Sequence, residues 1–453
     1  MSLGACRLKK CVLIVVGLCA GLNLISCSSG APKSTKSGLP HRVLAAQGVT
    51  ATLTFGRLVI INGDNDTLPR VAPLNGGSSP GIMAVSPNRN IAATFDSGSN
   101  SVFAVDTARE ASIGSGVRLL GSSSSIVVPT SSPTGFAAVP TAAVNGFAFV
   151  GAVQVLNFST NSSTIIAVSN AQTVVSNSTG TQLLVFSPDS DAVTVLFPGS
   201  AVPPIDTSCY TNPTNTNPPN SACNVFTDPR LSRPVDAIVN GTTAYILNCG
   251  GQCGGTLPSG APAPASVAVF DLGSLTVTQT VTVDAATMAL LNGSTLYVAG
   301  TPPNTPCPAS QNTSAATCGM LDVVDLGSMQ VISRAAITDG YHIRMDLNSS
   351  GQIFIGSRNC TNIGNVNNPT GGEIRGCLSI YKTTDGSVLI PPDNGDVTGL
   401  QGFTTRNIEY VAEGGQLRVY DTTKDILLIN DFLPQGTIDI VGYVGDMKAI
   451  DFF

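Results

Sequence analysis

The sequence predicts an all-β fold, and two observations indicate it: the composition and the patterning of short apolar segments. Charged residues make up 11% of the 453 residues, against an average of about 25%, and Glu occurs at only four positions. The chain is therefore poor in strong helix formers. Val, Ile, Thr, Ser and Asn are abundant beside 47 Gly and 29 Pro, which favours strands joined by turns.

A repeated strand pattern specifies the architecture more closely. Alternating apolar segments that end in a turn residue recur at 266–274, 321–328 and 417–423. A strand with a central aromatic residue precedes several of these or similar segments. Those aromatic residues, spaced by 52, 57 and 56 positions, are Tyr245, Tyr297, Phe354 and Tyr410. A four-stranded unit that recurs every 40–60 residues is typical of a β-propeller blade.

The number of strands that open a unit gives the number of blades. Seven such strands are predicted at 82–85, 125–128, 172–175, 235–239, 287–290, 342–345 and 400–403. The first strands of the chain, Arg42–Val49, Gly56–Gly63 and Thr67–Ala72, lack one, and Lys448–Phe453 would supply it in the blade that contains Leu58–Asn62. We therefore predict a single propeller of eight blades, each of four antiparallel strands, closed by both ends of the chain. Seven blades remain the alternative if 125–200 forms one blade fewer.

The repeated strings resemble a known repeat class. Thr295-Leu-Tyr-Val-Ala-Gly300 and the Val-Val-Asp-Leu-Gly segment at 323–327 are similar to YVTN-type repeats of lactonase-like propellers. From about Arg42 onward the chain also resembles acidobacterial propeller lipoproteins of unassigned activity. The resemblance implies the fold, because the motifs specify blades and not a reaction.

The N-terminus predicts export and lipid attachment. Basic residues at 7, 9 and 10 precede an apolar run that ends in Leu24-Ile-Ser-Cys27, which resembles a bacterial lipobox. We expect a signal peptide at 1–26, a lipidated Cys27 with a flexible tether to His41, and the propeller at 42–453. Ser28, in place of a retention Asp, favours the outer membrane of a bacterial cell envelope, periplasmic or surface side. An ordinary cleaved signal peptide is the alternative.

Eight cysteines follow the export segment, and we expect them to form disulfides. They fall into neighbouring twos within loops, which favours the pairs 209–223, 249–253, 307–318 and 360–377; the residues are Cys209, Cys223, Cys249, Cys253, Cys307, Cys318, Cys360 and Cys377. An even number of cysteines in an exported chain is typical of disulfides. Zinc is the alternative, although no Cys-x-x-Cys or nearby His accompanies any pair.

Four residues are candidates for ligand binding. Arg233, Arg344 and Arg406 each stand near the start of an inner strand, and together they could bind an anion or an acidic sugar in the central channel. The alternative is that they pair with Asp236, Asp346 or Asp396. His342, in the segment Tyr341–Arg344, is the fourth candidate, although an inner-strand His more often satisfies hydrogen bonds within a blade.

Composition and motifs argue against several function classes. The net charge is −6 with no basic cluster after Lys36, so we expect no nucleic-acid partner. Only two His residues are present, and the acidic turns Asn62–Asp66 and Asp393–Asp396 lack EF-hand spacing. We therefore expect no metal and no cofactor. No catalytic set matching the lactonases can be assigned.

Loop lengths provide the best indication of function. Residues 249–265, 301–319 and 357–377 are predicted as three consecutive loops between second and third strands, all on one face and each with a cysteine pair. Long stapled loops on one face are a plausible binding surface. We therefore expect a lipid-anchored, monomeric binding or scaffold module for a protein or glycan of the envelope. A lactonase-like hydrolase or lyase at the channel and a purely structural component are the alternatives.

Overall fold

The computed structural model describes residues 36–49, 55–130, 133–143, 150–211, 222–303, 306–307, 317–361, 376–391 and 395–453. Two compact units divide the chain. Residues 39–69 and 73–453 form one unit, and residues 1–38 with 70–72 form the other. The predicted signal peptide, Cys27 and most of the predicted tether lie outside the described residues.

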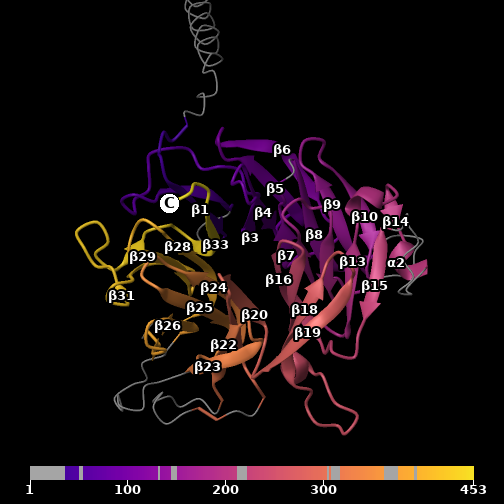
Figure 1. Ribbon diagram of the computed structural model, residues 1–453. Helices are drawn as coiled ribbons and strands as arrows, with labels where there is room; N and C mark the ends of the chain where they lie inside the picture. Colours follow the sequence, from indigo (N-terminus) through magenta and orange to yellow (C-terminus); the bar gives the residue numbers. More distant parts are fainter. Residues whose placement is uncertain are drawn as a thin grey trace, which may run out of the picture. The chain divides into compact units, whose positions relative to one another are not determined.

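The larger unit is an eight-bladed β-propeller (Figure 1). Each blade is a separate sheet, antiparallel except for one added parallel strand at the outer edge of blade 3, and one strand of each sheet lines a central channel. The inner strands contact one another in a closed cycle, in the order β33, β3, β7, β11, β16, β20, β24, β28 and back to β33. The region 125–200 contains two complete sheets, so the prediction of eight blades is confirmed and the alternative of seven is excluded.

The first four blades contain the following strands, each blade being given from the channel outward. Blade 1 is β33 (Tyr443–Ala449), β1 (Arg42–Gly48) and β2 (Arg57–Asn62). Blade 2 is β3 (Pro80–Val85), β4 (Ile91–Asp96), β5 (Ser101–Asp106) and β6 (Ala111–Arg118). Blade 3 is β7 (Ser125–Val127), β8 (Thr134–Ala143), β9 (Val150–Asn157), β10 (Ser162–Ala167) and the added β14 (Ile205–Asp206). Blade 4 is β11 (Thr173–Ser176), β12 (Leu183–Phe186), β13 (Ala192–Leu196) and β15 (Cys223–Thr227).

The last four blades follow the same plan. Blade 5 is β16 (Pro234–Asn240), β17 (Thr243–Asn248), β18 (Ala265–Asp271) and β19 (Thr276–Val283). Blade 6 is β20 (Met288–Asn292), β21 (Thr295–Gly300), β22 (Gly319–Asp325) and β23 (Gln330–Ile337). Blade 7 is β24 (Tyr341–Leu347), β25 (Gln352–Arg358), β26 (Leu378–Lys382) and β27 (Val388–Leu389). Blade 8 is β28 (Val397–Gly402), β29 (Ile408–Glu413), β30 (Gln416–Asp421), β31 (Ile426–Leu427) and β32 (Thr437–Ile438).

Helix is confined to short turns in the described residues, namely η1 (Pro198–Ser200), α2 (Ser208–Thr211) and η2 (Gly250–Cys253). None of the helices in these ranges is long and apolar enough to cross a membrane. The low content of Glu and of other helix formers explains this outcome.

The chain closes the ring by placing its last strand inside its first blade. β33 pairs antiparallel with β1, whose other edge pairs with β2, so the predicted sharing of one blade by both chain ends is confirmed. The predicted bounds of this strand, Lys448–Phe453, are wrong, because it ends at Ala449. The apolar tail beyond it packs as an anchor instead, with Phe453 edge-on to Phe403 at 4.2 Å between ring centroids.

The predicted strand Thr67–Ala72 is also absent. Only isolated bridges from Thr67 to Asn62 and from Leu74 to Leu58 lie along the outer edge of β2. Pro69 and Pro73 have no backbone N–H to donate, which prevents a continuous ladder at this edge. Blade 1 therefore has three strands where four were predicted.

The hydrophobic core lies in layers between neighbouring blades. Blades 8 and 1, for example, share a buried cluster that includes Tyr410, Val419, Ala45 and Met447. Alternation of side chains along a strand directs every second residue into the layer on one side and the next residue into the layer on the other. Because both faces of a blade are covered, its middle strands are almost entirely buried, as in β4 and β29.

Antiparallel connectivity gives the ring two different faces. In every blade the loop from the second to the third strand emerges on the same face as the connection that enters an inner strand. We name this the stapled face, because the connections between the second and third strands of blades 5, 6 and 7 each carry a disulfide there, Cys249–Cys253, Cys307–Cys318 and Cys360–Cys377. The opposite, closing face carries His41 and Phe453, whose rings stack at 5.0 Å where the two ends of the propeller meet.

Candidate functional site

Bulges in the inner strands shape the stapled-face end of the channel. In blades 1, 2, 5, 7 and 8 the register between the inner and second strands shifts near this end. The shifts leave Gly445, Gly81, Ile82 and Thr398 outside the regular ladder, and a bulge turns such a residue away from its expected direction. All four line one cavity of about 330 Å³ at the mouth of the channel.

Arg344 lies across the channel just below this mouth. Its Nε donates to the carbonyl of Thr398 at 2.9 Å, and Nη1 donates to the carbonyl of Ile343 at 3.0 Å. Its Nη2 donates to Asp446 at 3.1 Å. The side chain therefore joins blades 7, 8 and 1, and three nitrogens of the guanidinium already have acceptors. Arg344 acts as a structural crossbar at this level.

Two aspartates tie neighbouring inner strands together. Asp446 accepts the backbone N–H of Met83 in the next blade at 3.0 Å, and Asp346 accepts that of Gly402 at 2.5 Å. Burial of the Asp346 carboxyl raises its pKa, while the bond from Gly402 and the charge of Lys448 oppose the shift. These carboxylates fix the spacing of adjacent blades around the channel.

Asp236 is a channel carboxyl with a different environment. Its described hydrogen-bond donor is the adjacent N–H of Ala237, at 2.8 Å. Burial raises the pKa of Asp236 to about 6, against the lowering effects of that bond and of the positive charge of Arg344. A pKa of about 6 leaves a larger fraction of this carboxyl protonated near neutral pH than of an ordinary surface aspartate.

His342 points into the protein and away from the channel. The residue is fully buried, and its Nε2 lies 3.0 Å from the carbonyl of Thr338. Burial lowers the pKa of His342 to about 4, so the ring is neutral at pH 7. A Cβ on Gly319 would approach the ring to 2.8 Å, which shows how closely blade 6 packs against it.

The three predicted arginines do not converge. Arg233 has its Nε 3.9 Å from Asp191 in the stapled face between blades 4 and 5. Arg406 forms two 2.7 Å bonds to Asp66 on the closing face, where Asp66 also accepts from the buried Tyr410 at 2.5 Å. Each arginine has a carboxylate partner, but these are not the predicted Asp236, Asp346 and Asp396. Arg233 and Arg344 stand near the starts of inner strands as predicted, but the predicted position of Arg406 is wrong, because it follows the end of β28 and precedes the second strand β29. The alternation pattern did not distinguish the start of an inner strand from its end, and therefore did not show on which face Arg406 lies.

Arg358 is a candidate that sequence reasoning missed. It is the last residue of β25 and lines the cavity at the channel mouth together with Asp396, Tyr443 and Phe95. Its Nε is buried and has no hydrogen-bond acceptor among the described residues. The available signal was its position directly before the cysteine loop of blade 7, because this places a charge at the end of a second strand.

The predicted disulfide pairing is confirmed. The Cα atoms are 5.3 Å apart in Cys209–Cys223 and 5.6 Å apart in Cys249–Cys253. They are 4.9 Å apart in Cys307–Cys318 and 5.5 Å apart in Cys360–Cys377, all within the usual range for a disulfide. Four disulfides indicate an oxidising, non-cytoplasmic location.

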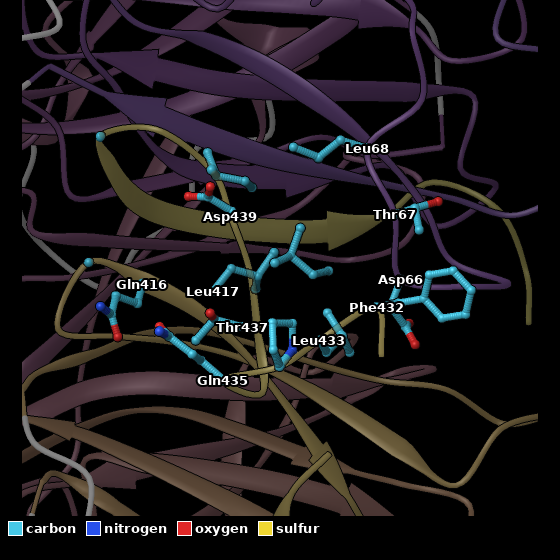
Figure 2. A pocket seen from close by; sticks show the side chains of 15 residues that line it. Asp66, Thr67, Leu68, Gln416, Leu417, Phe432, Leu433, Gln435, Thr437 and Asp439 are labelled. Carbon is cyan, nitrogen blue, oxygen red and sulfur yellow. The ribbon is translucent and has the colours of Figure 1, made fainter. Parts of the chain in front are cut away.

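Other hollows lie away from the channel. The largest described, about 650 Å³, is a groove between blade 8 and the turn after β2, and Figure 2 shows Phe432 and Asp66 close together in it. Two smaller grooves, of about 410 and 510 Å³, lie on the stapled face on either side of Ser190. Phe432 is 78% exposed, so the large groove has an apolar rim.

No group of three or more His, Cys, Asp and Glu side chains is placed to hold an ion in the described parts of the chain. Of the two acidic turns, Asp66 in the first is bonded to Arg406 and Tyr410. In the second, residues 393 and 394 lie outside the described residues.

Comparison with known proteins identifies the fold and no family. No family model matches the sequence, and no curated protein matches it. Among solved structures, dihydro-heme d1 dehydrogenase NirN in complex with DHE is similar at a TM-score of 0.53 and 12% identity, over 91% of this chain and 75% of NirN. The computationally designed Ika8 protein is similar at a TM-score of 0.50 and 9% identity, over 84% of this chain and 98% of Ika8.

A third similar structure is the hydrazine synthase of Kuenenia stuttgartiensis. Its TM-score is 0.43 at 12% identity, over 76% of this chain and 77% of that one. At such identities, similarity extends to the propeller fold alone, because one fold supports many unrelated functions.

Proposed function

We propose that this protein is an exported, lipid-anchored propeller that binds a protein or glycan of the bacterial cell envelope through its stapled face. The observation that carries the proposal is that three consecutive blades, 5, 6 and 7, each have a disulfide between their second and third strands on the face opposite His41. An anchor attached through the N-terminus would join the ring from the closing face. The stapled loops would then be free to meet a partner.

The resemblance to a lipobox at Leu24–Cys27 supports the anchor, and the disulfides support an exported location. Cys27→Ala should release the protein from membranes or leave it unprocessed, because acyl chains supply the attachment. Cell fractionation with and without detergent measures this. Normal processing together with membrane retention in the variant would contradict the lipid anchor.

Site-specific crosslinking tests the binding face. A photoreactive residue at Leu257, which is 44% exposed in the first stapled loop, should capture a partner in the native envelope. The same residue at Phe452, 66% exposed on the closing face, is the matched control. Equal capture at the two positions, or capture at Phe452 alone, would refute the assignment of the stapled face.

Asp236 favours a second candidate, a lactonase-like hydrolase or lyase acting in the channel. A carboxyl with a pKa of about 6 is suited to proton transfer near neutral pH. Purified protein should then open simple lactones with a rate that Asp236→Asn abolishes. Absence of turnover, or equal turnover by the variant, would remove this candidate and leave the binding function as proposed.

A further inference from the structure

We propose that the cavity at the channel mouth binds a uronate-type acidic sugar, whose carboxylate contacts Arg358. This inference rests on the proposed function, because the cavity opens on the stapled face. At about 330 Å³, it is at the lower end of the range of roughly 300–1,000 Å³ for ligand pockets. A single sugar ring with a short extension suits such a site better than a folded protein surface does.

The first support is the state of the Arg358 guanidinium. Arg42, Arg344 and Arg406 each donate to a carboxylate at 2.7–3.1 Å. By contrast, the buried Nε of Arg358 has no acceptor among the described residues. A buried donor without a partner is unfavourable, and a ligand carboxylate can accept two parallel bonds from such a fork. An anionic group is therefore the chemistry that this side chain fits.

The second support is a carboxylate in the same cavity that does not neutralise Arg358. Asp396 also lines the cavity, and its Oδ1 accepts the backbone N–H of Asn359 at 2.9 Å. No ion pair within 4.0 Å joins Asp396 to Arg358 in the described structure. A ligand that carries both an anion and hydroxyl donors can satisfy the two groups together, and a uronate has both.

The third support is the apolar part of the lining. Tyr443 is 41% exposed, and Phe95 and Ile82 complete this side of the cavity. Aromatic side chains offer an apolar face with a polar edge, which matches the C–H face and hydroxyl rim of a pyranose. A small anion such as phosphate would leave these surfaces unused.

The bulges explain how the ring makes room for this site. Gly81, Ile82, Thr398 and Gly445 all leave the regular ladder at the same height. Bulges are over-represented next to functional sites, where they re-aim side chains or end a ladder. Arg344 bonds to the carbonyl of Thr398 and to Asp446 next to these bulges, so it is already occupied and leaves Arg358 as the cation that lines the cavity.

Calorimetric titration of the mature, unlipidated full chain tests the proposal. Trigalacturonate and free galacturonate should bind, while neutral galactose and acetate should not. Arg358→Gln should weaken binding roughly tenfold to a hundredfold, because hydrogen bonds to charged groups contribute about 1.5–3 kcal/mol. Arg230→Gln, on the same face but paired with Asp228 at 2.7 Å, should bind as the parent does. Arg358→Lys should recover part of the affinity.

The arms of the titration separate the outcomes. If both probes bind, a single uronate ring is sufficient as a ligand. If trigalacturonate binds and free galacturonate does not, the ligand is a polysaccharide chain. No uronate binding, unchanged binding by Arg358→Gln with a parental melting temperature, or equal binding of acetate would overturn the proposal. If the sugar site fails by one of these outcomes, crosslinking distinguishes the two proposals. Capture of a partner through Leu257 that persists in Arg358→Gln would then show that the wider binding function still holds.

Discussion

The two faces of the propeller differ in the kind of link that stabilises each of them. On the stapled face the links are covalent and local: the three disulfides join residues 4, 11 and 17 positions apart. On the closing face the links are non-covalent and span the chain, as between Arg42 and Asp451, 409 positions apart. The disulfides therefore constrain loops, while ion pairs, ring contacts and one strand ladder hold the ring closed.

The closing face concentrates its contacts on Arg42. This side chain forms 2.7–2.8 Å bonds to Asp451 through Nη2 and Nε, and 2.7 Å bonds to Glu110 and to the carbonyl of Thr107 through Nη1. The side-chain bond to Asp451 is the main cause that raises the pKa of Arg42, while burial opposes the rise. The network joins the first strand, the tail and blade 2 at one point.

The largest effect should come from removing β33. Truncation after Gly442 leaves β1 without its inner neighbour, so an open sheet edge and a breached core layer should abolish cooperative unfolding and cause aggregation. Differential scanning calorimetry and size-exclusion chromatography measure this. Truncation after Asp451, which keeps both β33 and the bonds from Arg42 to Asp451, is the control and should remain folded. If the chain truncated after Gly442 melts like the parent, the ring does not depend on its closing strand.

The next largest effect should come from Arg42→Ala. Glu110 and Asp451, with side chains 4% and 20% exposed, would then lose their cation, which should cost about 3 kcal/mol of unfolding free energy. Denaturant unfolding measures it. Arg109→Ala is the matched control, because its side chain is 80% exposed and its loss should change stability by less than about 0.5 kcal/mol. Equal effects would mean that the closing network contributes no more than a surface pair.

A comparable or smaller effect is expected on the stapled face. Replacing Cys360 and Cys377 together by Ser should lower stability by about 3 kcal/mol from lost loop-closure entropy, and replacing Cys249 and Cys253 by about 2 kcal/mol. The shorter loop gives the smaller value because its separation is 4 residues and not 17. Thermal and denaturant unfolding of the two double variants check the order. A reversed order would show that local loop shape, and not chain entropy, sets the stability of this face.

The smallest effect should be a change in how the free energy of unfolding depends on pH. It is caused by Asp236, which lies in the channel between the two faces. The folded-state pKa of Asp236 is about 6, above its unfolded value of about 3.9. The folded state therefore binds more protons between these values, and stability falls as pH rises through this window. The difference in unfolding free energy between Asp236→Asn and the parent should therefore grow, in favour of the variant, by about 2 kcal/mol as the pH rises from 4 to 7.

Melting curves of the parent and Asp236→Asn at several pH values measure this difference. His342, whose pKa is about 4 in the folded protein, acts in the opposite direction, because stability rises with pH between 4 and its unfolded value of about 6.5. This contribution is common to both proteins and cancels in the comparison. A difference that does not change with pH would show that the Asp236 carboxyl is not buried in solution.

The local features of the fold could be predicted from the sequence, while its long-range contacts could not. Strand alternation and the aromatic spacing from Tyr245 to Tyr410 specify blades, and neighbouring cysteines pair because their loops bring them together. The tail was misassigned because Phe452 and Phe453 continue an apolar pattern, although Phe453 is used for packing against Phe403. Pairing of Arg406 with Asp66, 340 positions away, depends on ring geometry that periodicity does not contain. The same limit hid Arg358, because its cavity is assembled from four blades.

Closure by β33 also determines when the molecule can be completed during its synthesis. Residues 443–449 leave the ribosome after every other strand of the described ring, so blade 1 lacks its inner strand until the seven other blades have been synthesised. The seven other blades contain all their own strands, whereas the channel cannot be enclosed at that stage. An emerging chain therefore cannot form the finished ring, which agrees with the export that we propose, since an unfinished ring can cross a membrane before folding ends. Final assembly then follows release, when the tail reaches Arg42 and Phe403.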